Sequence, residues 1–268
     1  MTDDKLAHGV DQVDYLGRLR LDGRGIVVLG GGDGIGRESC LALAQAGARV
    51  LCVDRDAALA EAVAKEVDGD FFAADITSRE DMAKLFAFAG DKYGSDLKGI
   101  VNVVGVAFIK PFPDIDEEIW DKQFDIVLRH AYLTLQIGAP MLAANGGGSM
   151  TFVGSMSGMG SIRNQTAYGS AKAALHHLVR GGASEYGPQQ VRVNVVVPSF
   201  IRTPRLVAKL DQSMWDKMTS VTPLGRVSTP DEIASAILFL QSDLASFVSG
   251  AVFPVDGGVT AQSPLTEF

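Results

Sequence analysis

A tyrosine and a lysine stand four residues apart in "AYGSAK" (167–172), a stretch that is otherwise small and polar. Residues i and i+4 share one face of a helix, so a helix here places the Tyr168 phenol next to the Lys172 ammonium. A free tyrosine titrates near pH 10, and its use as an acid or base near pH 7 requires roughly 4 kcal/mol of preference for the phenolate. One positive charge at about 5 Å supplies on the order of 3 kcal/mol at an effective dielectric constant of about 20. The pair is therefore suited to proton transfer, and the alternative is a solvated helix face.

Ser155 lies 13 residues before Tyr168 and ends the apolar run 149–155. If this run is a strand of a parallel sheet, Ser155 and the start of the next helix converge at the carboxyl edge, where such sheets gather their functional groups. A hydroxyl there can hold a substrate carbonyl oxygen while Tyr168 donates or removes its proton. The spacing therefore predicts a catalytic group of Ser155, Tyr168 and Lys172.

The elements that must position these residues alternate between short β-branched runs and longer helical patterns, which is typical of βαβ units. Seven runs are apolar on both faces, as expected of parallel strands covered by helices, namely 25–30, 49–54, 70–75, 99–105, 149–155, 191–199 and 251–258. The predicted fold class is α/β, a single-domain doubly wound (Rossmann) seven-stranded parallel sheet with helices on both faces.

Several helices carry start signals. Thr77 with Glu80, and Thr229 with Glu232, have the spacing of a capping box, and Pro230 suits the first position of the second helix. The chain shows no linker, repeat or low-complexity tract. The predicted organisation is an N-terminal extension over 1–20, one domain over 21–260 and a C-terminal tail over 261–268.

A glycine loop follows the first predicted strand, in "LGGGDGIGRE" (29–38). Gly30, Gly34 and Gly36 fit the pattern G-x-x-x-G-x-G at the start of a helix. Such a loop lets the backbone approach a pyrophosphate, whose charge is met by the free N–H groups of the helix N-terminus. The loop predicts a dinucleotide site, although glycine clusters also form ordinary tight turns.

Asp54 ends the second predicted strand, 18 residues after Gly36. Its carboxylate is placed to accept hydrogen bonds from the ribose of adenosine and would repel a 2′-phosphate, which favours NAD(H) over NADP(H). Asp33 within the loop points the same way, whereas Arg55 leaves NADP(H) open. The alternative for Asp54 is a turn residue at a strand end. Asp75, at the end of the third predicted strand, has the analogous position for the adenine.

Composition excludes several other classes of function. The chain has 268 residues and a formal charge of −8, so it has no basic surplus for nucleic acid or an anionic membrane, and a small molecule is the better partner. Cys40 and Cys52 sit in apolar runs and are expected to be reduced core residues, and the four histidines form no metal-ligand pattern. No apolar run reaches the roughly 18 residues of a membrane span, and no signal peptide is evident, so we expect a cytoplasmic protein.

With these residues in place, residues 21–260 resemble the short-chain dehydrogenase/reductase family in its common form of about 250 residues. Besides the glycine loop and "YGSAK", the resemblance includes "VRVNVVVPSFIRTP", "PLGRVSTPDEIASAILFL" and "SFVSGAVFPVDGG". It implies hydride transfer between NAD(P) and an alcohol or ketone, in a homotetramer or dimer.

The same resemblance implies residue roles. Tyr168 would be the acid/base, Lys172 would bind the nicotinamide ribose and lower the tyrosine pKa, Ser155 would orient the substrate, and Thr203 would contact the carboxamide. The cofactor-binding set implied by the motifs is Gly30, Gly34, Ile35, Gly36, Asp54, Asp75, Ile76, Asn102, Tyr168, Lys172, Ile201 and Thr203.

The chain departs from the family pattern at four places. Leu29 replaces the threonine before the glycines, "NVVG" (102–105) replaces "NNAG", and Ser199 replaces the glycine of a Pro-Gly pair. Val127 aligns with the active-site asparagine that normally supports a proton-relay water near the lysine, and a valine side chain forms no hydrogen bond. Three alternatives remain at this point: a backbone carbonyl and water carry the relay unaided, His130 substitutes, or turnover is slow. A surface or interface position is the more ordinary role for His130.

Substrate choice should reside in the segments that follow the fourth, fifth and sixth strands. They contain a flexible, sulfur-rich and aromatic set, which suits a bulky apolar alcohol such as an alicyclic, aromatic or steroid-like one. The residues are Phe108, Met156, Met159, Phe200, Leu206, Met214, Trp215 and Met218, although such residues are often simple core. Two other functions stay open: a 3-ketoacyl reductase, which generally favours NADP(H), and a non-catalytic dinucleotide-binding sensor or scaffold.

Overall fold

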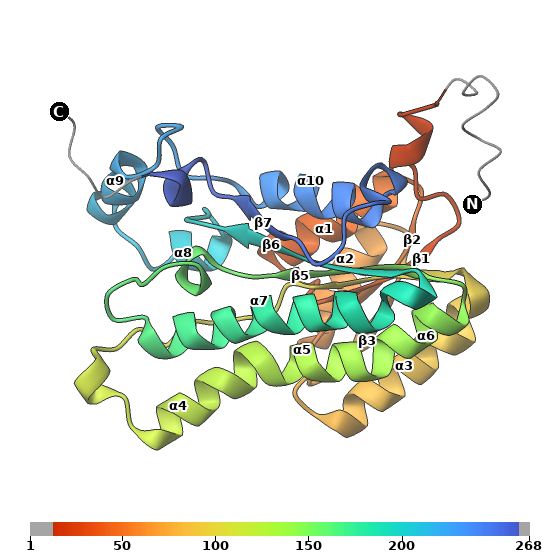
Figure 1. Ribbon diagram of the computed structural model, residues 1–268, viewed down its shortest axis with the longest axis horizontal. Coiled ribbons are helices and arrows are strands. Elements are labelled where there is room, and N and C mark those ends of the chain that lie inside the picture. Colours follow the sequence, from red (N-terminus) through yellow and green to blue (C-terminus); the bar gives the residue numbers. More distant parts are fainter. Residues whose placement is uncertain (1–12, 263–268) are drawn as a thin grey trace.

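The computed structural model describes residues 13–262, so the tail from 263 onward and residues 1–12 of the predicted extension lie outside the described residues. Seven parallel strands form one sheet in the order β3-β2-β1-β4-β5-β6-β7 (Figure 1). The strands are β1 (Gly25–Leu29), β2 (Arg49–Asp54), β3 (Asp70–Ala73), β4 (Leu97–Asn102), β5 (Gly148–Val153), β6 (Val191–Pro198) and β7 (Val252–Val255). The chain runs outward from β1 to β3 and then crosses to β4 on the other side of β1, which confirms the predicted doubly wound fold.

The middle of the sheet is apolar on both faces, as predicted. All five residues of β1 and seven of the eight residues of β6 are buried. The prediction was wrong for the two edge strands: β3 alternates between half-buried and exposed residues, and in β7 two exposed residues lie between two half-buried ones. An edge strand has a neighbour on one side only, and helices cover it less completely.

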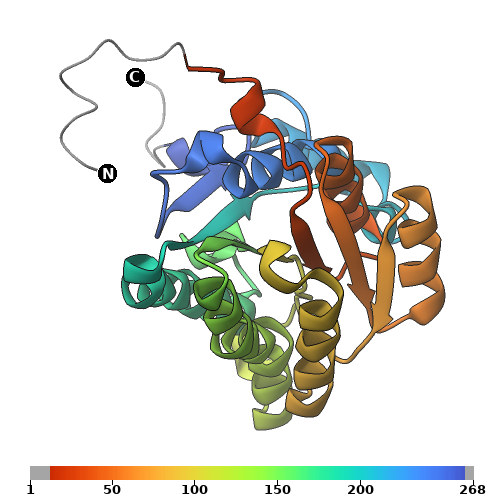
Figure 2. The ribbon, with the colours of Figure 1, turned by 90° about the vertical axis from the view of Figure 1, so that its right-hand side faces the viewer.

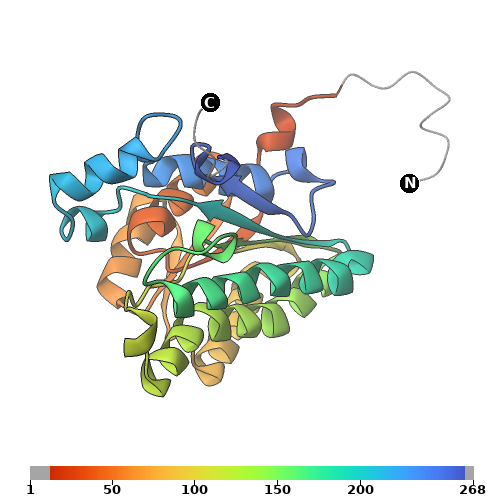
Figure 3. The same cartoon turned by 60° about the vertical axis from the view of Figure 1, so that its left-hand side comes forward.

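Helices cover both faces of the sheet (Figures 1 and 2). One face carries α1 (Gly34–Gln45), α2 (Ala57–Glu66) and α10 (Pro230–Gln241), and the other carries α3 (Arg79–Tyr93), α4 (Glu117–Phe124), α5 (His130–Leu133), α6 (Ala139–Ala144) and α7 (Thr166–Tyr186). Each layer has its own apolar core against the sheet. Two short helices, α8 (Pro204–Val207) and α9 (Gln212–Ser220), lie at one end of the molecule (Figure 3).

The two predicted capping boxes have different outcomes. The box at α10 is confirmed, since the Thr229 backbone N–H donates to Glu232 Oε2 at 3.0 Å. The prediction of Thr77 as the cap of α3 was wrong, because Ser78 occupies that position and its hydroxyl accepts from the Asp81 N–H. Thr77 instead donates to Asp75 Oδ1 through both its N–H and its hydroxyl.

The run from α4 to α6 is helical throughout, but two π-helical segments interrupt it, Asp125–Arg129 and Thr134–Gly138. Such segments contain an inserted residue and are frequent at functional sites. The first of them contains Val127, and α7 packs against it. Val127, which replaces the asparagine of the family pattern, therefore lies in a π-helical segment rather than in a regular α-helix.

Three predictions from composition can be compared with the described residues. Cys40 and Cys52 are free and buried, as predicted. Residues 13–262 contain no group of three or more His, Cys, Asp or Glu side chains that could hold a metal ion. Over the same residues, each helix is too short or too polar to cross a membrane.

Candidate active site at the carboxyl edge of the sheet

The predicted site residues meet where the central strands end, at the left of Figure 1. The glycine loop connects β1 to α1, Asn102 ends β4, Ser155 follows β5, and Thr203 follows β6. The edge between β1 and β4 is the point where the chain reverses its direction across the sheet. In open α/β sheets, ligands bind in the crevice at this position.

The glycine loop leaves room only for a backbone. A Cβ atom on Gly36 would lie 1.9 Å from the Gly30 carbonyl oxygen, so no side chain fits at this position. A Cβ on Gly34 would meet only the Thr203 side chain, at 3.6 Å from Cγ2. Helix α1 begins at Gly34, and the side chain of its N-cap residue, Asp33, makes no capping hydrogen bond. The open cradle and the uncapped helix N-terminus fit the pyrophosphate of a dinucleotide.

Asp54 lies directly beside this loop. Its Oδ2 atom accepts a hydrogen bond from the Gly32 N–H at 3.1 Å, and its Oδ1 atom accepts from the Asp56 N–H at the same distance. These bonds fix the carboxylate next to the cradle. Asp75 is held in a turn by Thr77, whose hydroxyl and N–H lower the pKa of its carboxyl group. Asp54 is therefore fixed at the carboxyl end of β2 beside the glycine loop, and Asp75 lies in the turn that follows β3.

Ser155 and Tyr168 come together although they belong to different elements. Ser155 precedes a short 3₁₀ turn, Met156–Gly158, and its hydroxyl accepts from the Ser157 N–H at 3.2 Å. Tyr168 lies in the first turn of α7. Burial raises the pKa of Tyr168, and its contact with the Ser155 side chain lowers it. The two hydroxyls therefore share one site, as the spacing predicted.

Lys172 lies one turn further along α7 and is completely enclosed, with 2% of its surface exposed. Its Nζ atom donates to the Val153 carbonyl at 2.7 Å and lies 5.8 Å from the centre of the Tyr168 ring. A Cβ atom on Gly105 would lie 2.8 Å from Nζ, so the glycine leaves space for the ammonium. Burial lowers the pKa of Lys172 to about 7.

This geometry refines the expected effect of the lysine on the tyrosine. In the cofactor-free protein the pKa of Tyr168 is raised rather than lowered, because burial disfavours the phenolate. The same burial disfavours the ammonium of Lys172 and so weakens its effect on the phenol. Additional positive charge is therefore needed before Tyr168 can work as a base near neutral pH.

Behind Lys172 lie polar side chains whose role the sequence did not reveal. His130 is buried, with 1% of its surface exposed, so the expectation of a surface or interface position was wrong. Asn102 is buried as well, and its Nδ2 atom lies 3.0 Å from both His130 Nδ1 and Thr134 Oγ1. The side chain of Asn102 therefore supports the protein interior, and the cofactor-binding role that the motif implied is not visible in its contacts.

His176, one turn after Lys172 on α7, was not singled out either. It is buried, and Cβ atoms on Gly154 and Gly158 would lie 2.4 Å and 2.7 Å from its ring. Burial, followed by the charge of Lys172, lowers its pKa to about 4. The helical spacing i, i+4 from Lys172 was the available signal, because it places both side chains on one face.

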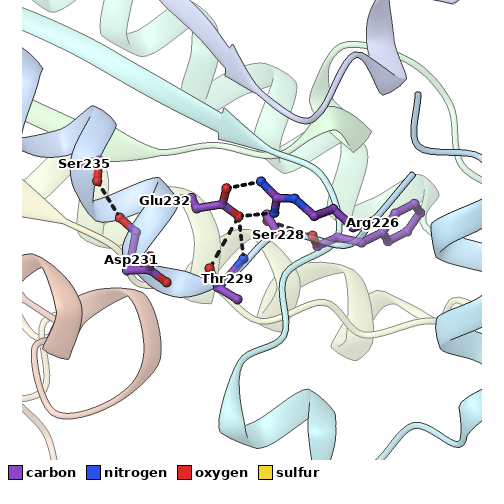
Figure 4. A network of polar contacts seen from close by, with 7 residues as sticks. Arg226, Ser228, Thr229, Asp231, Glu232 and Ser235 are labelled. Atoms are coloured by element: carbon purple, nitrogen blue, oxygen red, sulfur yellow. Dashed lines mark hydrogen bonds and ion pairs between the residues drawn. The ribbon is translucent and has the colours of Figure 1, made fainter. Parts of the chain in front are cut away.

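The segment after β6 is held by hydrogen bonds from the residues that precede α10. The Arg202 N–H donates to the Ser228 carbonyl at 2.8 Å, and the Ser228 N–H and hydroxyl both donate to the Phe200 carbonyl. Arg226 pairs with Glu232, which also accepts from the Thr229 N–H (Figure 4). This network fixes the segment that carries Ile201 and Thr203.

The remaining predicted cofactor residues are apolar. Ile76 and Ile201 are buried, and Ile35 is partly buried in the first turn of α1. Thr203 caps α8, where its hydroxyl accepts from the Leu206 N–H at 3.4 Å. Its Cγ2 and Cβ atoms lie next to the glycine loop, at Gly34.

The predicted substrate-facing side chains divide into three groups, of which the half-buried one contains Phe200, Leu206 and Met218. Phe108, Met159 and Met214 are exposed, in the segments that follow the carboxyl ends of the strands. Trp215 and Met156 are buried, with Trp215 under the Arg202 guanidinium at 4.8 Å, so these two belong to the core rather than to an open wall. The wide cavity of about 780 Å³ lies at the opposite, amino end of the strands, where Lys98, Ser149 and Arg192 line it. It is therefore not the site of this chemistry.

Comparison with known proteins gives consistent relatives. Residues 30–260 match the family model described as enoyl-(acyl carrier protein) reductase. The chain is 37% identical to 7α-hydroxysteroid dehydrogenase of Escherichia coli strain K12 over 245 residues, which cover 90% of this chain and 95% of the relative. It is 34% identical to galactitol 2-dehydrogenase (L-tagatose-forming) of Cereibacter sphaeroides over 254 residues, which cover 92% and 99%.

The fold is similar to solved structures as well. One is 7α-hydroxysteroid dehydrogenase in complex with NADH and 7-oxo glycochenodeoxycholic acid. It matches with a TM-score of 0.87 and 36% identity, covering 92% of this chain and 98% of that one. The relatives named here are dehydrogenases of small-molecule alcohols, and their folds extend over nearly the whole of this chain.

Proposed function

Because the chain belongs to the short-chain dehydrogenase/reductase family of oxidoreductases, we propose that it is an NAD(H)-dependent enzyme that interconverts a secondary alcohol and a ketone on a bulky apolar substrate. The observation that carries the proposal is the convergence of Ser155, Tyr168 and Lys172 next to the glycine loop. Helix α7 supplies an acid/base and a cation, and the segment after β5 supplies a hydroxyl, beside the glycine loop that connects β1 to α1.

The preference for NAD(H) rests on Asp54. Its carboxylate is fixed by the Gly32 and Asp56 N–H groups beside the cradle, and a 2′-phosphate there would meet a negative charge at short range. The pyrophosphate would lie against Gly30, Gly34 and Gly36, with Lys172 at the nicotinamide ribose. A solved relative that binds NADH supports this choice.

In the mechanism, Tyr168 holds and moves the proton of the substrate oxygen. A bound oxidised nicotinamide, held by the glycine loop and Lys172, would supply the hydride acceptor and the positive charge that the phenolate needs. Ser155 binds the substrate oxygen through its hydroxyl, because its Oγ atom faces Tyr168. Lys172 stabilises the phenolate from the next helical turn, and its bond to the Val153 carbonyl fixes the position of its ammonium. Proton removal by a positioned base contributes typically 10²- to 10⁴-fold to the rate.

The substrate class follows from the segments at the carboxyl end. Phe108, Met159 and Met214 are exposed there and offer apolar, adaptable contact area. Such a wall suits an alicyclic, aromatic or steroid-like alcohol, and a relative that acts on a hydroxysteroid supports this class. We expect a cytoplasmic homotetramer or dimer, and both remain predictions.

Two alternatives keep specific support. A relative that is 31% identical over 246 residues, a 3-oxoacyl-[acyl-carrier-protein] reductase of Thermotoga maritima, supports a 3-ketoacyl substrate. Val127 and the altered "NVVG" segment favour a non-catalytic dinucleotide-binding sensor. Against the first stands Asp54, since such reductases generally favour NADP(H), and against the second stands the intact group of Ser155, Tyr168 and Lys172.

The experiment is a spectrophotometric screen at 340 nm with the wild type and Tyr168→Phe. It tests NAD⁺ and NADP⁺ against a panel of cyclic, aromatic and steroid alcohols, and NADH and NADPH against a 3-ketoacyl thioester. We expect the wild type to reduce NAD⁺ with one of these alcohols. In Tyr168→Phe the rate of NADH formation should be about 10³-fold lower, in the range for a lost acid/base. Cofactor binding without turnover in both proteins would support the sensor. Turnover restricted to NADPH and a 3-ketoacyl thioester would support the reductase.

A further inference from the structure

The buried side of Lys172 holds polar atoms whose hydrogen bonds are incomplete. One N–H of its ammonium donates to the Val153 carbonyl, and the described residues provide no acceptor for the other two. His130 Nε2 is also enclosed without a partner among residues 13–262. Buried polar atoms are rarely left unpaired unless a water or ligand completes them. The charge of Lys172 lowers the pKa of His130, after the larger effect of burial, so the two groups lie within electrostatic reach.

The hydrogen bonds of Asn102 decide which nitrogen of His130 carries the proton. Asn102 Oδ1 accepts from the Val104 N–H at 3.2 Å, so the amide oxygen is fixed and Nδ2 is the donating end of the amide. Nδ2 points at His130 Nδ1 at 3.0 Å and at Thr134 Oγ1. The tautomer with the proton on Nε2 is the one in which Nδ1 accepts from this amide, while the Ile126 carbonyl, which also contacts the ring, raises the pKa of His130 against the larger effect of burial. Burial keeps the ring neutral, since it lowers the pKa of His130 to about 3.

His130 is also suitably placed relative to Val127. The two residues are three positions apart in the helical run, and both are fully buried. The π-helical segment Asp125–Arg129 ends immediately before His130 and packs against α7, which carries Lys172. Where the side chain of Val127 offers no polar atom, His130 offers an imidazole ring three residues later.

We propose that His130 is a positioning residue that holds a buried water molecule between its Nε2–H and the ammonium of Lys172, and that this water connects Tyr168 to solvent. The proposal rests on the proposed function. In alcohol oxidation, Tyr168 gains the hydroxyl proton of the substrate and must lose it before the next turnover. Lys172 passes an N–H proton to the water, the water releases one of its own protons outward, and Lys172 regains a proton from the side of Tyr168. The net result is one proton moved from Tyr168 to solvent, with no oxidant or reductant consumed.

The first test uses the cofactor-free, full-length protein labelled with ¹⁵N in its imidazole rings. Long-range ¹H–¹⁵N spectra, assigned by the signal lost in His130→Gln, should show a neutral ring protonated at Nε2 from pH 5 to pH 8. The Nε2–H signal should show magnetisation transfer to a bound water. His176 and Lys172 on α7 are the other titratable groups that face this region, so their signals are followed in the same series. A ring protonated at Nδ1, or one that titrates near pH 6.5, would overturn the proposal.

The second test measures turnover of the best alcohol from the screen. His130→Leu should lower kcat about tenfold, within the range for lost proton transfer, with KM changed less than about twofold and an increased solvent deuterium effect. His130→Gln, which retains an N–H donor, should retain most of the rate. Adding Val127→Asn to His130→Leu should restore kcat, whereas the exposed His177→Leu on α7 should leave kcat unchanged.

Thermal unfolding of each variant separates the relay from a structural role. Recovery of kcat in the double variant without recovery of the melting temperature supports the relay. A His130→Leu variant with wild-type kcat overturns it. A double variant in which kcat recovers only together with the melting temperature overturns it as well. A wild type without turnover on every alcohol would instead overturn the proposed function and the relay with it, so the two failures are distinguishable.

Discussion

Replacing Lys172 by methionine should stabilise the cofactor-free protein at acidic and neutral pH while it removes activity. The lysine is the largest charged side chain in the interior of the described chain, and the only hydrogen bond that the described residues give its ammonium is to the Val153 carbonyl. Methionine has a similar length, fills the same space and carries no charge. The protein therefore retains a destabilising ammonium because its function uses it.

The magnitude follows from the pKa of Lys172, which burial lowers from 10.5 to about 7. At about 1.4 kcal/mol per pKa unit, the buried ammonium costs about 5 kcal/mol below pH 7. The unfolded chain binds more protons than the folded one between pH 7 and pH 10.5, so wild-type stability rises with pH over this window. By pH 9 the cost has fallen to about 2 kcal/mol, a gain of about 3 kcal/mol for the wild type.

The lost hydrogen bond to Val153 offsets part of this gain in the variant, by about 1 to 3 kcal/mol. We therefore expect Lys172→Met to exceed the wild type by about 2 to 4 kcal/mol at pH 6 and to match it near pH 9. Urea unfolding of both proteins at pH 6, 7, 8 and 9 measures the difference, with the exposed Lys209→Met as the matched control. Parallel pH curves for the wild type and Lys172→Met, or a variant less stable at pH 6, would refute the reasoning.

Three further changes test the rest of the site. Asp54→Asn removes the charge but keeps an oxygen that accepts from the Gly32 N–H. The ratio of kcat/KM with NAD⁺ to kcat/KM with NADP⁺ should therefore fall about tenfold, and an unchanged ratio would contradict the role of Asp54. Gly105→Ala places a Cβ atom 2.8 Å from Nζ of Lys172, which must move the ammonium. We expect kcat to fall about tenfold with the melting temperature nearly unchanged, and a wild-type kcat would contradict the role of this glycine. The hydrogen bond from Arg226 lowers the pKa of Glu232 from 4.5 to about 2. The ionised carboxylate therefore stabilises the fold fully above pH 4.5, and this stabilisation is lost as the pH falls towards 2. In urea unfolding, Glu232→Gln should lower the free energy of unfolding by about 1 kcal/mol at pH 7, a small value because the pair is partly exposed, and by much less at pH 2.5. An equal loss at both pH values would show that the ion pair is not its source.

The sequence alone determined the fold and the identity of the central site residues. Apolar runs of β-branched residues alternate with amphipathic helices, and this local pattern is compatible with few architectures other than a parallel doubly wound sheet. The glycine loop, Asp54, Ser155 and the Tyr168–Lys172 pair were found because their spacing along the chain is set by backbone geometry. Local periodicity also marked the capping box of α10, but it missed Ser78 at α3, where neighbouring polar residues compete for the same cap.

Tertiary structure decided the electrostatics of the site. The sequence spacing places a cation near Tyr168, but only packing reveals that Lys172 and His130 are enclosed, and enclosure shifts both pKa values downward. The same holds for Trp215 and Met156, whose residue types suit a pocket wall but which are buried in the core. Side-chain type and spacing are properties of the chain, whereas desolvation depends on which distant segments close over a group. That is why the sequence could predict which residues meet at the candidate site and could not give their charge states.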